Sequence, residues 1–142
     1  MTRYLLDVNV VIALVDPMHV HHERAHRWFA ARSGTPWCTS PVVQNGALRI
    51  LAHPNYPNTQ SMPAVVMSLS SLVSHPEHEF LADSVSLLTG DVRRERLLSS
   101  AQVTDSYLLA LAVASDAQLV TFDTKLVTIA VPGGAEALLA LT

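Results

Sequence analysis

Short apolar runs alternate along this chain with longer segments in which hydrophobic residues recur at helical spacing. An apolar run that lacks the every-second-residue alternation is typical of a strand buried on both faces, as in a parallel sheet. Each of the first and fourth runs ends in an aspartate. We expect strands over residues 3–7, 37–40, 79–82 and 118–122, and a fifth over 137–141.

The intervening segments carry helix start and stop signals. Aspartate, serine or threonine often caps a helix, and proline fits its first turn. Asp16–Pro17 predicts the start of a helix that Ser33–Gly34 ends, and Thr104 predicts the cap of a long helix near the end of the chain. The helices are expected over residues 8–14, 17–32, 41–51, 62–74, 91–96 and 105–115.

Strands that alternate with helices predict parallel pairing, with helices on both faces of the sheet. The composition agrees, because 49% of the residues are hydrophobic and only 15% are charged. Such a chain of 142 residues has enough apolar material for a core and is not disordered. We expect one domain over residues 1–142.

Several classes of protein are excluded. Cys38 is the only cysteine, which rules out a disulfide scaffold and a thiolate metal centre and favours a small buried residue in a reducing, cytoplasmic setting. Residues 50–76 lack charges, but prolines and amides interrupt them, so no membrane span is expected. The net charge of −3 means that any contact with nucleic acid must come from a local basic patch.

Three aspartates suggest chemistry. Asp7 follows the first predicted strand and Asp123 the fourth, and ligands of parallel sheets bind at the carboxyl ends of the strands. Asp105 begins the long helix. Alone, each could be a helix cap or a partner of the helix dipole. Together they would repel one another unless a cation neutralised them, and hard carboxylate oxygens suit Mg²⁺ or Mn²⁺.

Histidines and arginines offer further candidates. His19, His22 and His26 share a helix face, but the sequence supplies no convincing third ligand for zinc, and a solvated face is the preferred interpretation. The densest basic cluster comprises Arg93, Arg94 and Arg96. It is either a solvated face paired with neighbouring acids or, if the acidic site acts on nucleic acid, a phosphate-binding patch.

Four segments appear in an order and spacing that resemble a known family. They are YLLDVNVV at 4–11, PVVQNGALR at 41–49, VTDSYLLA at 103–110 and TFD at 121–123. The family is the PIN domains, and the similarity is greatest to the VapC toxins of bacterial toxin–antitoxin pairs. The resemblance spans nearly the whole chain.

The resemblance implies a three-layer α/β/α sandwich with a central parallel sheet, and an endoribonuclease that uses Mg²⁺ or Mn²⁺ to activate water. It assigns catalysis and metal binding to Asp7, Asp105 and Asp123. Gln44 stands where the family usually has a glutamate. The remaining assignments are Asn9, Gln44 and Thr121 for the pocket lining, and Arg49, Arg93, Arg94 and Arg96 for RNA. A small antitoxin and a second copy of the chain are the expected protein partners.

Two alternatives remain open. Gln44 lacks the charge of a glutamate, so the chain could be a catalytically weak PIN module that binds RNA or a protein partner. Asp7 could instead be the nucleophile of a phosphoryl-transfer enzyme of the haloacid dehalogenase kind. That second pattern requires an aspartate where Asn9 stands.

Overall fold

The computed structural model describes residues 3–142 and contains a parallel five-stranded sheet. Its strand order is β3-β2-β1-β4-β5, so the direction of chain progress reverses between the neighbours β1 and β4. The predicted strands are present with small shifts at their ends. They are β1 (Arg3–Leu6), β2 (Trp37–Thr39), β3 (His78–Phe80), β4 (Ala117–Thr121) and β5 (Leu138–Ala140).

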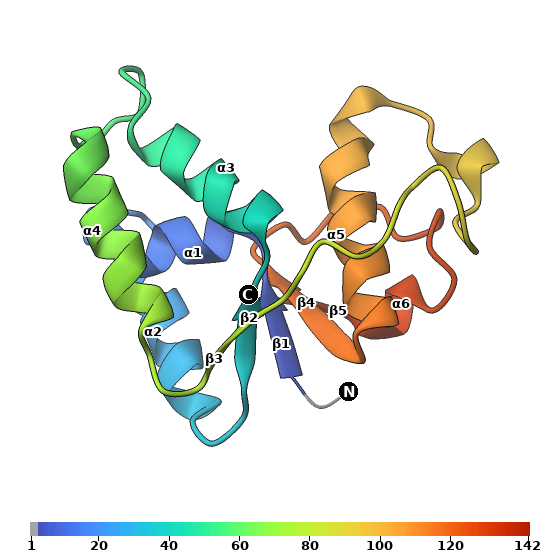
Figure 1. Ribbon diagram of the computed structural model, residues 1–142, viewed down its shortest axis with the longest axis horizontal. Coiled ribbons are helices and arrows are strands. Elements are labelled where there is room, and N and C mark those ends of the chain that lie inside the picture. Colours follow the sequence, from blue (N-terminus) through green and yellow to red (C-terminus); the bar gives the residue numbers. More distant parts are fainter. Residues whose placement is uncertain (1–2) are drawn as a thin grey trace.

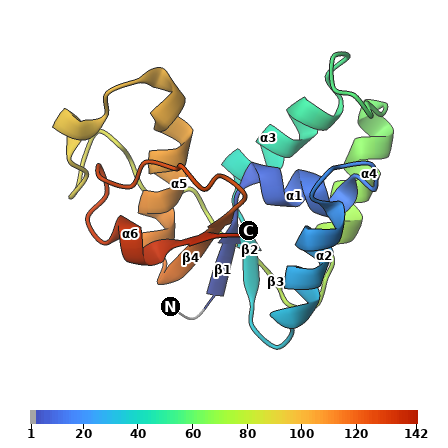
Figure 2. The same ribbon diagram turned by 180° about the vertical axis from the view of Figure 1, so that it is seen from behind.

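Two groups of helices flank the sheet. In Figure 1, α1–α4 lie to the left of β1 and α5 and α6 to its right, and Figure 2 shows the same division from behind. The predicted α/β/α sandwich around a parallel sheet is therefore confirmed. The helices are α1 (Val8–Val15), α2 (His22–Ala31), α3 (Pro41–Leu51), α4 (Met62–Val73), α5 (Val103–Ala114) and α6 (Gly134–Ala137). Within residues 3–142, none of them has the length and apolar character needed to cross a bilayer.

The carboxyl-terminal residues of β1 and β4 are buried, which explains why the apolar residues there do not alternate with polar ones. Leu5 and Leu6 of β1 and Leu119 and Val120 of β4 have no exposed surface. Burying a side chain of this size stabilises the fold by about 1.5–3 kcal/mol. The core therefore fixes the positions at which β1 and β4 end.

A glycine allows α3 to approach the start of α1. A Cβ atom built on Gly46 would lie 3.0 Å from Cγ2 of Val8, tighter than an ordinary contact. A side chain at this position would require the Val8 side chain to move by a few tenths of an ångström. Gly46 thus helps to bring α3 close to the residues that follow β1.

The predicted helix start at Asp16–Pro17 is wrong. Asp16 is instead the C-cap of α1, and α2 begins only at His22. The Asp16 carboxylate accepts a hydrogen bond from the amide of Met18, which makes a turn of the segment between the helices. The predicted end of the helix at Ser33–Gly34 is close to the observed one, since Gly34 has a φ of +94° just after α2.

Two further predictions about helices are wrong. The segment expected to be helical over 91–96 forms a single 3-10 turn, η1 (Arg94–Arg96). Thr104 lies within the first turn of α5 rather than capping it, because a second 3-10 turn, η2 (Ser100–Gln102), leads directly into that helix. The side chain of Gln102 accepts from the Leu98 amide and donates to the Arg96 carbonyl, which stabilises this entry.

Candidate active site

A cavity of about 310 Å³ opens beside the carboxyl ends of β1 and β4. This is the point at which the strand order reverses, where open parallel sheets bind their ligands. The sheet places Asp7 and Asp123 here, and the first turn of α5 adds Asp105. The lining residues are Asp7, Val8, Asn9, Ile12, Gly46, Arg49, Ile50, Thr104, Asp105 and Asp123.

Asp7 is held in place by two hydrogen bonds. Its Oδ1 accepts from the amide of Val8 at 2.7 Å, as the N-cap of α1, and its Oδ2 accepts from the hydroxyl of Thr121 at 2.8 Å. Only 6% of the residue is exposed. These contacts orient the carboxylate from both the helix and the neighbouring strand.

The Thr121 hydroxyl joins the residues that follow β1 to those that follow β4. Besides donating to Asp7, it accepts from Nδ2 of Asn9 and from the amide of Asp123, both at 3.1 Å. Oδ1 of Asn9 in turn accepts from the Phe122 amide at 3.2 Å. A hydroxyl has one proton and two lone pairs, so Thr121 is fully used.

Thr121 and Asn9 therefore act differently from one another. Thr121 is completely buried and does not line the cavity, contrary to the prediction. Its hydroxyl is instead fully used in hydrogen bonds with Asp7, Asn9 and the Asp123 amide. Asn9 is among the residues that line the cavity.

The carboxylates destabilise one another's charged forms. Burial raises the pKa of Asp105 to about 6, and the charges of Asp7 and Asp123 add to this effect. The pKa of Asp7 is also raised by burial, which outweighs its hydrogen bonds to Thr121 and Val8, and the charge of Asp123 contributes. The cavity thus concentrates negative charge that the surrounding protein leaves poorly compensated.

The donor set fits a hard divalent cation. Carboxylate oxygens are the ligands that Mg²⁺ and Mn²⁺ prefer, and a cation would relieve the repulsion that raises these pKa values. Within residues 3–142, no three His, Cys, Asp or Glu side chains are gathered closely enough to hold an ion by themselves. Mg²⁺ is commonly bound through one or two carboxylates together with several waters, so this spacing suits it.

Gln44 lies elsewhere than predicted. It is absent from the cavity lining, and its Nε2 donates to Oγ1 of Thr39 at 3.0 Å. The same Thr39 hydroxyl is 2.8 Å from Nε2 of His78. Gln44 therefore belongs to a polar chain that ties α3 to β2 and β3.

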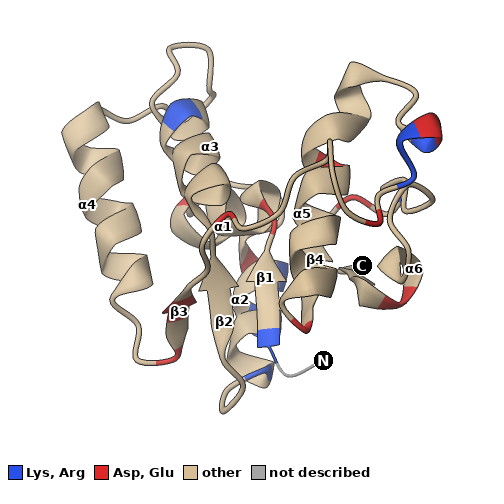
Figure 3. Cartoon of the chain, turned by 45° about the vertical axis from the view of Figure 1, so that its right-hand side comes forward, with Lys and Arg blue, Asp and Glu red and all other residues tan. Residues whose placement is uncertain are grey.

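The predicted RNA-contacting arginines fall into two regions. Arg49 is exposed and lines the cavity. Arg93 donates to the Ile129 carbonyl, and Arg94 and Arg96 belong to the η1 turn, outside the cavity lining. Figure 3 shows the basic positions of α3 and of the η1 segment on opposite sides of α5.

The histidines have structural partners. A ring nitrogen of His22 is 2.7 Å from the Ala13 carbonyl, and one of His26 is 2.8 Å from the Leu14 carbonyl. Both carbonyls belong to the last turn of α1, where the C=O groups have no N–H donor within the helix. The shared face of His22 and His26 thus satisfies the end of α1.

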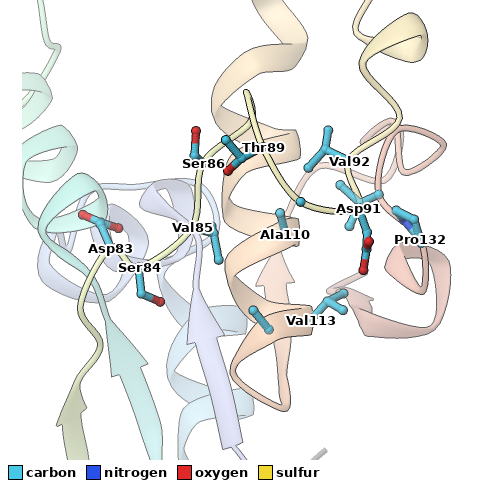
Figure 4. A pocket seen from close by; sticks show the side chains of 13 residues that line it. Asp83, Ser84, Val85, Ser86, Thr89, Asp91, Val92, Ala110, Val113 and Pro132 are labelled. Atoms are coloured by element: carbon cyan, nitrogen blue, oxygen red, sulfur yellow. The ribbon is translucent and has the colours of Figure 1, made fainter.

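A larger cavity of about 580 Å³ lies between the 83–92 segment, α5 and the residues near Pro132. Figure 4 shows apolar side chains such as Val85, Val92 and Val113 around it. None of the three aspartates of the candidate site lines this cavity. The larger cavity has carboxylates of its own in Asp83 and Asp91, but only the smaller cavity brings together the three aspartates that follow β1 and β4 and begin α5.

Comparison with known proteins agrees with this geometry. The model of the PIN domain family matches residues 4–132. The chain belongs to the PIN domain family. This PIN domain is 45% identical over 132 residues to Ribonuclease VapC44 of Mycobacterium tuberculosis, covering 92% of the chain and 93% of that protein. It is 39% identical over 136 residues to Ribonuclease VapC39, covering 94% and 98%.

A solved structure supports the fold of the PIN domain. The crystal structure of VapC20 from Mycobacterium tuberculosis, described as a sarcin–ricin loop cleaving toxin, aligns with a TM-score of 0.51. The alignment covers 75% of this chain and 80% of VapC20 at 16% identity. The resemblance to VapC-type PIN proteins, drawn from four short segments, is confirmed by the relatives above.

Proposed function

We propose that this PIN domain is a divalent-metal-dependent endoribonuclease and the toxin of a toxin–antitoxin pair. Its relatives VapC44 and VapC39 are named ribonucleases. The observation that carries the proposal is the single cavity lined by Asp7, Asp105 and Asp123, in which burial and like charge raise the pKa of two of them. Such unrelieved repulsion is a mark of a site built for a cation.

We assign different roles to the three aspartates. Asp7 and Asp105 would hold Mg²⁺ or Mn²⁺, and Asp123 would orient the attacking water. When bound, the ion polarises the scissile phosphate and lowers the pKa of a bound water. Thr121 and Asn9 keep Asp7 and the 121–123 segment in fixed geometry. Arg49 at the cavity edge would pair with a phosphate of the RNA.

The expected substrate is single-stranded or looped RNA. The carboxylates lie in a cavity rather than on a flat surface, and a backbone splayed out of a helix can reach into such a site. Hydrolysis of a phosphodiester by a metal-activated water needs no protein nucleophile. Asn9 uses its amide oxygen and nitrogen to hold the Phe122 amide and the Thr121 hydroxyl beside Asp7.

We also propose that a small antitoxin blocks this cavity. An acidic pocket open to solvent suits a guanidinium, which pairs with carboxylates in a planar fork. An arginine or lysine of the antitoxin placed against Asp7 and Asp105 would compete with the divalent ion. A homodimer remains part of the proposal on the strength of the family resemblance.

The test is cleavage of a fluorescent structured RNA by purified protein, titrated with Mg²⁺ and Mn²⁺ after treatment with EDTA. We expect cleavage to require the added ion and to fall by about 100-fold or more in Asp105→Asn, since loss of a group that stabilises developing charge has effects of that size. Glu136→Gln removes an exposed carboxylate of α6 outside the cavity and serves as the matched control.

Two results would contradict the proposal. Cleavage by Asp105→Asn at the wild-type rate, in preparations shown to be free of contaminating nuclease, would remove the aspartates from the mechanism. RNA binding without cleavage at any metal concentration would favour the weak PIN module, for which Gln44 is the specific observation. Membership of the PIN family leaves the haloacid dehalogenase alternative without support.

A further inference from the structure

An aromatic and basic cluster adjoins the cavity through Phe122. This residue lies between Thr121 and Asp123, and its amide is bound by Asn9. The ring of His21 stacks on the ring of Phe122 with centroids 4.5 Å apart and planes at 19°. The guanidinium of Arg24 lies 5.2 Å from the centre of the same ring and also contacts His21.

Arg24 connects this cluster to a second cavity, of about 300 Å³. Arg24, Arg27 and Trp28 of α2 line one side of it, and residues 140–142 line the other. The end of the chain thus returns beside α2, as Figure 2 shows. A basic and aromatic surface therefore runs from the edge of the carboxylate cavity, past Phe122, along α2.

The two arginines have no carboxylate partner within the described part of the chain. The ion pairs formed there are Arg3 with Glu79 and Arg32 with Glu77. Arg27 is exposed and Arg24 half-buried. In a chain of net charge −3, the two arginines form a local basic patch on α2.

We propose that His21, Arg24, Arg27, Trp28 and Phe122 form a subsite for single-stranded RNA, which holds the nucleotides on one side of the cleaved bond. Guanidinium groups that track phosphates, interspersed with aromatic rings on which bases stack, are the usual means of binding single strands. The subsite rests on the proposed function and adds the path by which the RNA strand leaves the carboxylate cavity. Arg49, on α3, then contacts the substrate at the cavity itself.

An RNA strand fits this surface better than an acidic peptide does. The aromatic rings are continuous with the segment that carries Asp123, so an occupant here extends directly into the candidate active site. An acidic peptide would use the arginines, but it has no bases to stack on the aromatic rings of Phe122 and Trp28.

The experiment measures binding separately from cleavage. A 5′-fluorescein-labelled 12-nucleotide single-stranded RNA is titrated with protein in EDTA, and fluorescence anisotropy gives the Kd at several NaCl concentrations. Each phosphate contact contributes about 0.7 to the slope of log Kd against log salt for a single strand. The double variant Arg24→Gln/Arg27→Gln should lower that slope by about 1.4 and weaken binding about ten-fold at low salt.

Control variants separate this subsite from general charge. Lys125→Gln removes one positive charge outside the groove and should change Kd less than Arg24→Gln does. Arg24→Lys/Arg27→Lys keeps the charge and should retain the salt slope. Thermal unfolding of every variant shows whether it is folded. If the glutamine double variant does not fold, the lysine double variant still tests the subsite.

The outcomes distinguish this subsite from the proposed function. An unchanged salt slope in Arg24→Gln/Arg27→Gln would overturn the subsite whether or not the protein cleaves RNA. The subsite would also be overturned if Lys125→Gln weakened RNA binding as much as Arg24→Gln does. Binding of a 12-residue polyglutamate as tight as that of the RNA would also overturn it, in favour of a peptide. Failure to cleave with added metal, with the slope lowered as expected, would overturn the nuclease and leave the RNA subsite standing.

Discussion

Helix α1 carries a buried aspartate at each end, and the two behave in opposite ways. Asp7 is the N-cap and Asp16 the C-cap, with 6% and 5% of their surfaces exposed. The pKa of Asp7 is raised above its ordinary value, whereas that of Asp16 is lowered. Both residues expose little surface, but the Asp7 carboxylate lies deeper in the protein than that of Asp16.

Asp16 is surrounded by donors. Burial raises its pKa, but hydrogen bonds from the Tyr56 hydroxyl, from Nδ2 of Asn58 at 2.7 Å and from the Met18 amide at 2.9 Å outweigh that effect. These contacts tie the loop between α3 and α4 to the end of α1. Asp16 in its charged form stabilises the fold.

Asp7 has two donors and faces other carboxylates. Its hydrogen bonds to Val8 and Thr121 do not offset burial and the charge of Asp123. A protein that keeps such a group bears a cost in stability, which is expected where function requires it. The comparison teaches that deep burial, fewer hydrogen-bond donors and a nearby like charge together distinguish the Asp7 carboxylate of the candidate active site from that of Asp16.

The largest expected difference between the two ends of α1 is in RNA cleavage. Asp7→Asn removes a proposed metal ligand and should lower the rate by about 100-fold or more. Asp16→Asn, measured below its unfolding temperature, should cleave within about three-fold of the wild type, because Asp16 lies outside the cavity lining. Parallel rates under Mg²⁺ check this, and equal losses would show that the contrast between the two aspartates has no functional meaning.

For the free energy of unfolding, we expect the opposite order, with Asp16→Asn having the larger effect. Asp16→Asn leaves an amide that cannot accept from all three donors, so we expect a loss of about 2 kcal/mol in the free energy of unfolding. Because the folded-state pKa of Asp16 is lowered, its contribution is fully present above the unfolded pKa of about 4 and is lost progressively as the pH falls from there through the lower folded-state pKa. Urea unfolding at pH 7 and pH 3.5 measures both values, and a pH-independent loss would contradict the hydrogen-bond explanation.

Asp105 should show the opposite dependence on pH in metal-free protein. Its folded-state pKa of about 6 exceeds the unfolded value, so the charged carboxylate destabilises the fold increasingly as the pH rises from about 4 through 6. Asp105→Asn should therefore stabilise the protein at pH 7.5 by about 1 kcal/mol, after allowance for solvent screening, and by nothing at pH 3.5. Urea unfolding in EDTA tests this. A variant less stable than wild type at pH 7.5 would show that the site is not under electrostatic strain.

The sequence predicted the sheet and the meeting of the aspartates because these depend on strand order and buried runs. Asp7 and Asp123 follow β1 and β4, and neighbouring parallel strands bring their carboxyl ends together. Metal binding and catalysis by these residues remain predictions. The start of α2 was misplaced because an Asp–Pro pair signals a turn as well as a helix, and only the distant Tyr56 and Asn58 decide between them.

Other features depend on contacts that no local pattern encodes. The saturated hydroxyl of Thr121 and the stacking of His21 on Phe122 each join residues about a hundred positions apart. A threonine before Phe–Asp signals a strand end, but nothing in its surroundings reveals its three hydrogen bonds. The 3-10 turn η2 differs, because the Gln102 side chain bonds residues only four and six positions earlier, a local arrangement that helix-capping signals do not predict.

The smallest effect is expected at Gln44, where the sequence departs from the family. Affinity for a hard divalent cation depends strongly on the number of charged ligands, so a fourth carboxylate in the cavity would tighten binding markedly. Gln44 lies instead against Thr39, whose hydroxyl can donate to a carboxylate while His78 donates to it in turn. We therefore expect Gln44→Glu to change the Kd for Mn²⁺ by less than about two-fold in calorimetric titrations, with Asp7→Asn as the variant that loses binding. A ten-fold tightening would show that the side chain at position 44 reaches the cavity and completes the site.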